Sequence, residues 1–384
     1  MKKRILLSGL FLMILICWTS TGQLFAQNQQ SSSGSVNDKV DYVNYMNSLR
    51  ANPITGTINP LDVQRAHDQV DQMRALKTAK ALNLTWTELG PDNFSGRTRC
   101  LLIERNNPSV LFAGSTGGGL WKSTTSGTSW SQVSISSSSA MVISSITQGS
   151  DNAIYIATGD ANSMTGNMGA GNMNETPSAY GIGYIGNGIW KSTDGGGTFN
   201  LLSNTDPVDN DTTADFAAIS KILVHPANPN IVYAVTRKAF KMSTDGGANW
   251  VTVNDNTSTP LTGKATDVEA HSDGTVAVAV NGLLYVSNDG SSGTFAKKST
   301  GGFHQLPSAT STRMEIAIAP SNSSYIYVVR VGTNCDIYQC TYKGDSASLI
   351  GPGGSLSFNI FGMATANVGW YSMALAVSPS NAGK

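Results

Sequence analysis

The stretch from Trp190 to Phe199 reads WKSTDGGGTF, and the stretch from Phe240 to Trp250 reads FKMSTDGGANW. In both, a serine, an aspartate and a pair of glycines follow a short run that contains a lysine, and an aromatic residue closes the motif. Aspartate and serine side chains accept hydrogen bonds from turn amides, and glycine adopts the positive φ of a tight turn. The motif therefore predicts a rigid turn after a strand, with its aromatic residue packed back on the sheet.

Two weaker copies of this motif flank the first pair. Trp121–Trp130 carries Thr125 at the aspartate position, and Ser287–Phe295 is one residue longer. We expect a structural rather than a catalytic role for the residues that shape these turns, which are Ser123, Trp130, Ser192, Asp194, Phe199, Ser243, Asp245, Trp250, Ser287, Asp289 and Phe295.

A pair of apolar strands precedes each turn. Leu101–Ala113 matches Ile222–Ala234 position for position, including an Asn-Pro turn between the strands. The second strand of the pair recurs as Val110–Ala113, Ile154–Ala157, Ile231–Ala234, Val276–Ala279 and Ile326–Val329. A repeat of roughly 45 residues with four short strands is typical of a propeller blade. The sequence therefore predicts an all-β fold, a β-propeller of at least five four-stranded blades.

Composition supports this fold class and excludes one class of partner. Charged residues make up only 13% of the 384 residues, and 40 residues are glycine. Without Lys2, Lys3 and Arg4 of the leader, the 25 basic residues fall to 22 against 25 acidic ones. A mildly acidic surface argues against nucleic acid, which requires a basic footprint.

The N-terminus has the pattern of a signal peptide. A basic start, an apolar run from Ile5 to Ile16 and a small residue at Ala26 predict cleavage before Gln27. A polar tether and two helical patterns then occupy residues 27–83, and the propeller occupies residues 84–384. We expect a secreted or cell-surface protein, without a transmembrane segment in the mature chain.

The turn motif resembles the Asp box, or BNR repeat, of sialidases, sortilin-type Vps10 domains and family 74 glycosidases. Trp86–Asn93, followed by Gly96–Arg99, looks like the start of secreted bacterial sortilin-like propellers. Such proteins are common in Bacteroidota, and many leave the cell by the type IX route. The resemblance implies the propeller fold and export with the help of a secretion machinery, and it implies little about activity.

Both enzyme families can be tested on residues. In family 74 glycosidases the first-blade loop carries a catalytic aspartate before a glycine pair, and this chain resembles that loop but has Thr116 there. A threonine cannot replace a carboxylate in glycoside hydrolysis. The Arg-Ile-Pro segment of sialidases is also missing. We therefore expect a non-catalytic module that binds a glycan, a polysaccharide or a protein without a cofactor or metal. The alternative is a glycoside hydrolase.

Three pairs of charged residues on innermost strands are candidate ligand-binding residues. They are Arg97 with Arg99, Asp267 with Glu269, and Arg313 with Glu315. A spacing of two places both side chains of a pair on one face of a strand. Solvated channel residues joined by salt links are the alternative interpretation. Asp160, together with Asn162, is a further candidate as an oxygen ligand of Ca²⁺, with a simple turn as the alternative.

Three other segments carry expectations. The Gly-, Asn- and Met-rich stretch Ala161–Asn187 predicts a long loop. Cys335 and Cys340 either pair or are two buried thiols. Leu375–Val377 matches Ile222–Val224, so a sixth repeat begins there. Because a closed propeller pairs its first and last strands, we expect an open arc with this segment at its edge, and a longer parent protein.

Overall fold

A computed structural model describes residues 97–135, 141–159, 186–207, 214–308, 313–331, 335–351 and 373–383, together with residues 51, 65, 68, 69, 72 and 73. All of them belong to the second of the two units into which the chain divides, Ala51–Lys384. Residues 65, 68, 69, 72 and 73 are helical, as the second helical pattern predicts. Asp160 and most of Ala161–Asn187 lie outside the described residues.

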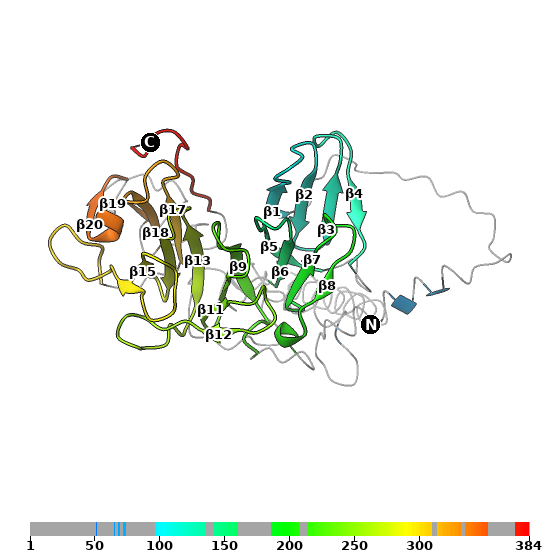
Figure 1. Ribbon diagram of the computed structural model, residues 1–384, viewed down its shortest axis with the longest axis horizontal. Helices are drawn as coiled ribbons and strands as arrows, with labels where there is room; N and C mark the ends of the chain where they lie inside the picture. Colours follow the sequence, from blue (N-terminus) through cyan, green and yellow to red (C-terminus); the bar gives the residue numbers. More distant parts are fainter. Residues whose placement is uncertain are drawn as a thin grey trace, which may run out of the picture. The chain divides into compact units, whose positions relative to one another are not determined.

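The described residues form five four-stranded antiparallel sheets, each built from strands that are consecutive in the chain (Figure 1). The all-β propeller prediction is therefore confirmed. The first sheet consists of β1 (Thr98–Ile103), β2 (Leu111–Ser115), β3 (Leu120–Ser123) and β4 (Ser131–Val133), and the second of β5 (Ile143–Gln148), β6 (Ile154–Thr158), β7 (Ile189–Ser192) and β8 (Asn200–Leu201). The third sheet consists of β9 (Ile219–Val224), β10 (Val232–Thr236), β11 (Phe240–Ser243) and β12 (Val251–Thr252), and the fourth of β13 (Ala265–Ala270), β14 (Val276–Val280), β15 (Leu283–Ser287) and β16 (Ala296–Lys297). The fifth sheet consists of β17 (Arg313–Ile318), β18 (Ile326–Val331), β19 (Cys335–Thr341) and β20 (Ser346–Leu349).

A hydrophobic core lies between each sheet and the next. In β6, Ile154 and Ile156 pack toward the first sheet, whereas Tyr155 and Ala157 pack toward the third. Because side chains alternate along a strand, a strand that is buried on both faces must be apolar at every position. This is why the second strands of the repeat read as continuous apolar runs.

The first strands of the sheets lie side by side in chain order. Contacts run from β1 to β5, from β5 to β9, from β9 to β13 and from β13 to β17. Residues 373–383 continue this order beside the fifth sheet, where we expected them. Met373 and Leu375 pack on Val329 and Val331 of β18. From Met373 to Val377, side-chain exposure alternates between half-buried and exposed, as in a strand with one covered face.

The turn after the third strand is held by its serine and aspartate. The Ser243 hydroxyl donates to Asp245 Oδ1 over 2.8 Å and accepts from the amide of Gly247 over 2.8 Å. Asp245 Oδ1 also accepts from the amide of Asn249, and Trp250 Nε1 donates to the carbonyl of Gly247. These bonds to the carboxylate lower the pKa of Asp245 to about 2. Equivalent hydrogen bonds to the serine hydroxyl occur at Ser123, Ser192 and Ser287.

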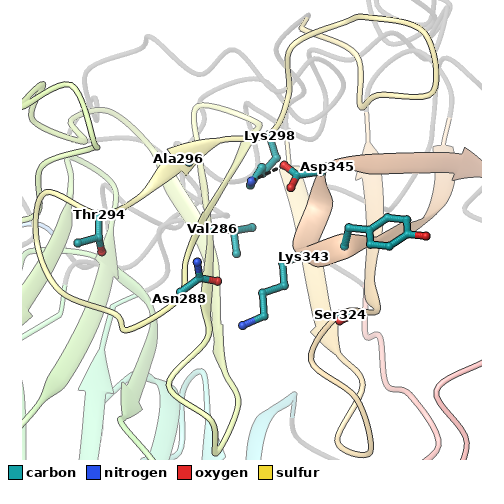
Figure 2. Close-up of a pocket in the computed structure, with 9 residues that line it drawn as sticks. Val286, Asn288, Thr294, Ala296, Lys298, Ser324, Lys343 and Asp345 are labelled. Atoms are coloured by element: carbon teal, nitrogen blue, oxygen red, sulfur yellow. Dashed lines mark hydrogen bonds and ion pairs between the residues drawn. The ribbon is translucent and has the colours of Figure 1, made fainter.

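A cross-strand pair of side chains locks this turn to the preceding sheet. Tyr155 of β6 lies opposite Lys191 of β7, and both donate to the carbonyl of Gly246 in the third sheet's turn over 3.1 Å. We call this contact the interlock. It recurs as Lys122 Nζ to the Gly195 carbonyl and as Tyr233 Oη to the Gly290 carbonyl. Tyr327 of the fifth sheet donates instead to the carbonyl of Ala382, near the end of residues 373–383. The fourth sheet lacks it, and a groove opens there (Figure 2).

The predicted alignment of the second strands was wrong by one residue in two sheets. It placed Val110 and Ile231 level with Ile154, whereas β2 begins at Leu111 and β10 begins at Val232. The amides of Val110 and Ile231 close the preceding Asn-Pro turn instead. Apolar character alone does not separate the last residue of a turn from the first residue of a strand.

We predict that Tyr233→Phe destabilises the protein by about 1 kcal/mol, because the variant loses a buried hydrogen bond and leaves the Gly290 carbonyl without its donor. Urea denaturation measures this change. The stacking of the ring on Phe240, 5.6 Å between centroids, is retained. Tyr285→Phe is the control, since it removes a half-buried hydroxyl for which the described structure contains no hydrogen bond. Equal effects of both substitutions would contradict a role for the interlock.

We further predict that Asp245→Ala lowers the melting temperature and leaves the affinity for any ligand nearly unchanged, because the carboxylate bonds only within its own turn. Differential scanning calorimetry and a binding assay measure the two effects separately. A variant with a normal melting temperature and no binding would contradict the structural role of this residue.

Candidate functional site

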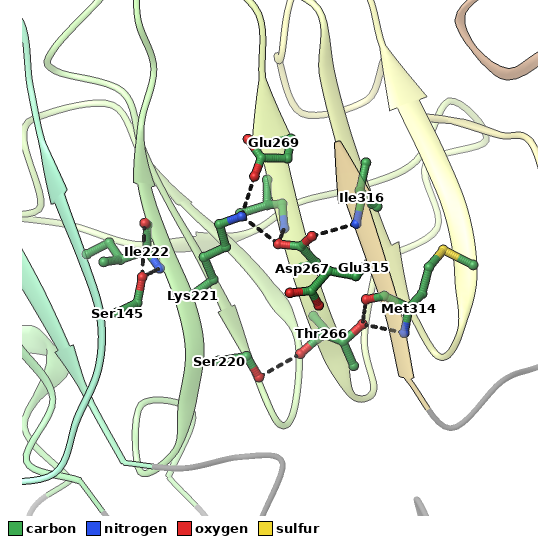
Figure 3. A network of polar contacts seen from close by, with 12 residues as sticks. Ser145, Ser220, Lys221, Ile222, Thr266, Asp267, Glu269, Met314, Glu315 and Ile316 are labelled. Carbon is green, nitrogen blue, oxygen red and sulfur yellow. Dashed lines mark hydrogen bonds and ion pairs between the residues drawn. The ribbon is translucent and has the colours of Figure 1, made fainter. Parts of the chain in front are cut away.

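The first strands of neighbouring sheets are joined by side chains that bond to backbone groups. A β-bulge in β9 and another in β13 each insert one extra residue, Ser220 and Thr266. Because a bulged residue is turned out of the ladder, each hydroxyl reaches the next first strand. Ser220 Oγ donates to the Ala265 carbonyl over 3.2 Å, and Thr266 Oγ1 donates to the Met314 carbonyl over 2.9 Å (Figure 3).

A third bulge, at Ser144, lies in β5. The residue after each bulge makes a second link between neighbouring first strands. Ser145 Oγ accepts from the amide of Ile222 over 3.1 Å. At the same position of β13, Asp267 Oδ2 accepts from the amide of Ile316 over 2.7 Å. The equivalent residue of β9 is Lys221, which sequence reasoning did not identify as a site residue. The repeat itself carried the signal, because Lys221 occupies the register of Ser145 and Asp267.

Lys221 ties two of the predicted site residues together. Its Nζ lies 2.7 Å from Asp267 Oδ1 and also contacts a carboxylate oxygen of Glu269 (Figure 3). Asp267 is only 1% exposed, so this carboxylate is buried rather than solvated. Asp267 Oδ1 also accepts from the amide of Val268. Both oxygens of Asp267 are therefore occupied by partners from the protein.

The second predicted pair lies on β17, beside the first. Arg313 Nη2 lies 3.1 Å from Glu315 Oε2, which places both side chains on one face of the strand, and it donates to the Met373 carbonyl over 3.5 Å. Arg313 is 3% exposed. The structure thus brings four predicted residues, together with Lys221, into one group of three carboxylates and two cations. We call Lys221, Asp267, Glu269, Arg313 and Glu315 the charge cluster.

Burial and mutual repulsion shift the proton equilibria of the cluster. Loss of hydration, followed by the negative charge of Asp267, raises the pKa of Glu315 from 4.5 to about 7 against the opposing effect of Arg313. Burial also raises the pKa of Glu269. The pKa of Lys221 is lowered by burial, but Asp267 and Glu269 outweigh this effect, and the net pKa lies above its usual range. One carboxyl of the cluster therefore changes its charge near neutral pH.

The cluster contains a candidate general acid, but its most buried carboxylate is not free to act as a base. Glu315 has the raised pKa of a general acid. Asp267 cannot act as a free base or nucleophile, because Lys221 and the amide of Ile316 hold it. Within the described part of the chain, no three His, Cys, Asp or Glu side chains gather in a way that could hold a metal ion.

The other predicted residues lie elsewhere. Arg99 lies in β1, which packs beside β5, and Arg97 directly precedes that strand. Thr116, at the position of the family 74 aspartate, is 7% exposed, and its amide and hydroxyl both donate to the Arg97 carbonyl. Cys340 is a free thiol whose pKa is raised to about 12 by burial. No helix in the described residues is long and apolar enough to cross a membrane.

No family model and no curated protein matches the sequence. Among solved structures, an ancestral GH74 enzyme is 18% identical over 70% of this chain, with a TM-score of 0.49. A GH74 xyloglucanase from Xanthomonas campestris is 12% identical over 67%, with a TM-score of 0.38. YCF48 from Cyanidioschyzon merolae is 14% identical over 68% of this chain and 73% of its own length, with a TM-score of 0.42. The chain spans 33% and 45% of the lengths of the two GH74 proteins.

We predict that Glu315→Gln flattens the dependence of stability on pH. Because the pKa of Glu315 is raised in the folded state, the wild-type protein loses stability as pH rises from about 4.5 to about 7 and loses no more above that range. The loss is at most roughly 3 kcal/mol and is smaller if the cluster relaxes. Denaturation at pH 5 and pH 8 measures it. The loop variant Asp206→Asn should keep the wild-type dependence of stability on pH. The same dependence in Glu315→Gln would refute the assignment of this pH effect to Glu315.

Proposed function

We propose that this chain is an exported β-propeller of the Asp-box, sortilin-like type that binds a glycan, another polymer or a protein outside the cell without catalysis. Its signal-peptide pattern and its turn motifs support export and this type of propeller. On this proposal it would be delivered by a secretion machinery such as the type IX route and would act at the cell surface or in the medium.

One observation carries the non-catalytic part of the proposal. Two of the positions at which a carboxylate could act as nucleophile or base are unavailable. Thr116 replaces the first-blade aspartate and bonds to the backbone. Asp267, the most buried carboxylate of the charge cluster, is held by Lys221 and by the amide of Ile316. Glycoside hydrolysis needs two carboxyl groups that flank the scissile bond, and such a pair must be open to substrate.

Glycoside hydrolysis is the second candidate because of Glu315. Its pKa of about 7 suits a general acid, and its neighbours Asp267 and Glu269 are carboxylates. In that mechanism Glu315 would protonate the leaving oxygen, and Glu269, the more exposed of the two neighbours, would stabilise the oxocarbenium ion or activate water.

The test is an array of glycans, polysaccharides and extended peptides probed with the mature protein, with reducing-sugar release assayed on the same polysaccharides. We expect binding without release, and unchanged binding in Glu315→Gln. Release of sugar that is lost in Glu315→Gln would establish the hydrolase instead. Failure to bind any probe, with no release, would overturn both functions.

A further inference from the structure

The junction between the fourth and fifth sheets departs from the interlock. Its cross-strand position holds Ala277 of β14 opposite Val286 of β15. Neither side chain has a polar atom, and neither is long enough to reach the next sheet. At the same position the other four sheets have Phe112 with Lys122, Tyr155 with Lys191, Tyr233 with Met242 and Tyr327 with Gln339. Space that an aromatic ring or a lysine fills elsewhere is therefore open here.

The fifth sheet shows the matching change. In the turn after β19, Lys343 has a φ of 57° and stands in register with Gly246 and Gly290, each with a φ of 71°. A Cβ atom at Gly290 would lie only 2.2 Å from Tyr233 Oη. At the junction of the third and fourth sheets, a side chain at this position of the turn would therefore displace the tyrosine hydroxyl of the interlock. The fourth and fifth sheets therefore both depart from the repeat at this junction, and Lys343 is held in a conformation that favours glycine.

The result is an open groove of about 360 Å³ between β15–β16 and the turn that follows β19 (Figure 2). Its apolar wall is small and consists of Val286 and Ala296. Asn288 and Ser324 supply an amide and a hydroxyl, whereas the hydroxyl of Thr294 donates within its own turn. The volume is at the lower end of the range for small-molecule sites. The groove is too small for a bulky apolar ligand and has little apolar surface to offer one.

Each lysine of the groove has a carboxylate partner. Lys298 Nζ lies 2.5 Å from Asp345 Oδ1, and Lys343 Nζ lies 3.6 Å from Asp273 Oδ2. Asp273 lies outside the lining, whose charged residues are Lys298, Lys343 and Asp345. Because both ammonium groups are paired with carboxylates, they do not favour a strongly ionic ligand. The groove therefore suits a neutral ligand that both donates and accepts hydrogen bonds.

An exposed aromatic ring stands on the same turn. Tyr342 is 74% exposed, and it has a φ of 52° next to Lys343 at 57° and Gly344 at 95°. Two consecutive residues with side chains in this region are uncommon and occur where the surrounding structure enforces them. An exposed tyrosine offers a flat apolar face with a polar tip, which suits a ligand with both C–H and O–H surfaces.

We propose that this groove binds a unit of a neutral saccharide chain. Sugar hydroxyls both donate and accept, which matches the paired charges of the lining, the Asn288 amide and the Ser324 hydroxyl, and the C–H face of a sugar ring matches Tyr342. The proposal rests on the proposed function and narrows it, because it assigns glycan binding to the outer junction of the fourth and fifth sheets rather than to the charge cluster.

The decisive variant rebuilds the missing interlock. Val286→Lys with Lys343→Gly restores the lysine-to-glycine-carbonyl contact that joins the first sheet to the second. It fills the groove and relieves the positive φ, so the melting temperature should be unchanged or higher. Tyr342→Ala is the complementary variant, since it removes only the exposed ring. Lys297→Ala and Phe303→Ala are matched controls, an exposed lysine on β16 and an 89% exposed aromatic residue, both outside the groove lining.

The probes are neutral cello-, xylo- and manno-oligosaccharides, with extended peptides as a second arm, all measured by calorimetry on the full chain. We expect at least one saccharide to bind, with at least tenfold weaker binding in both groove variants and unchanged binding in both controls. A saccharide that binds all variants equally would overturn the groove site and leave the proposed function standing. Peptide binding that only the groove variants lose, without saccharide binding, would overturn the saccharide assignment. Absence of any binding would overturn the groove site together with the proposed function.

Discussion

The structure depends on how one sheet is held to the next, because each four-stranded sheet is narrow and has apolar residues on both faces. Burial drives the sheets together, but it has no direction and does not fix how far one sheet slides over another. The interlock supplies that constraint. A tyrosine hydroxyl or a lysine ammonium in one sheet donates to a glycine carbonyl in the next sheet's turn, as Tyr155 and Lys191 do at Gly246. The serine and aspartate of the turn then hold that carbonyl in place.

A second set of contacts fixes the inner edge of the same interfaces. The bulges in β9 and β13 turn Ser220 and Thr266 toward the backbone of the following strand. The charge cluster extends these contacts, since Asp267 accepts a hydrogen bond from the amide of Ile316 as Ser145 accepts one from the amide of Ile222. A buried ion pair contributes little net stability compared with a neutral or apolar substitute. The link between neighbouring first strands therefore does not require the charges of the cluster. For this reason Glu315 remains a candidate general acid.

Much of the fold could be predicted from the sequence, because turn chemistry is local. The WKSTDGGGTF motif indicates its own hydrogen bonds, and the alternation of apolar strands indicates how many sheets there are. The register of the second strands was harder to predict. Val110 and Ile231 are apolar but close a turn, and a one-residue slip exchanges the two faces of a strand. That slip concealed the alignment of Phe112, Tyr155, Tyr233, Ala277 and Tyr327, and with it the interlock. Of the site, the pairs on β13 and β17 could be identified from their spacing. Lys221 was missed although it occupies the same place in the repeat as Asp267, because its role depends on a bulge that the apolar pattern does not reveal.

Departures from a repeat carry more functional information than the repeat does. A contact that recurs from sheet to sheet is explained by its contribution to stability, so no ligand is needed to explain its residues. Ala277, Val286 and Lys343 break the rule together and on both sides of one junction. A loss of packing on one side alone would be an ordinary defect, repaired by relaxation of the neighbours. A matched change on both sides, which leaves an open polar groove and holds Lys343 at a positive φ, indicates a constraint beyond folding. By the same reasoning, the regular junctions between the first four sheets are the poorer places to look for ligands, although they contain the more recognisable motifs.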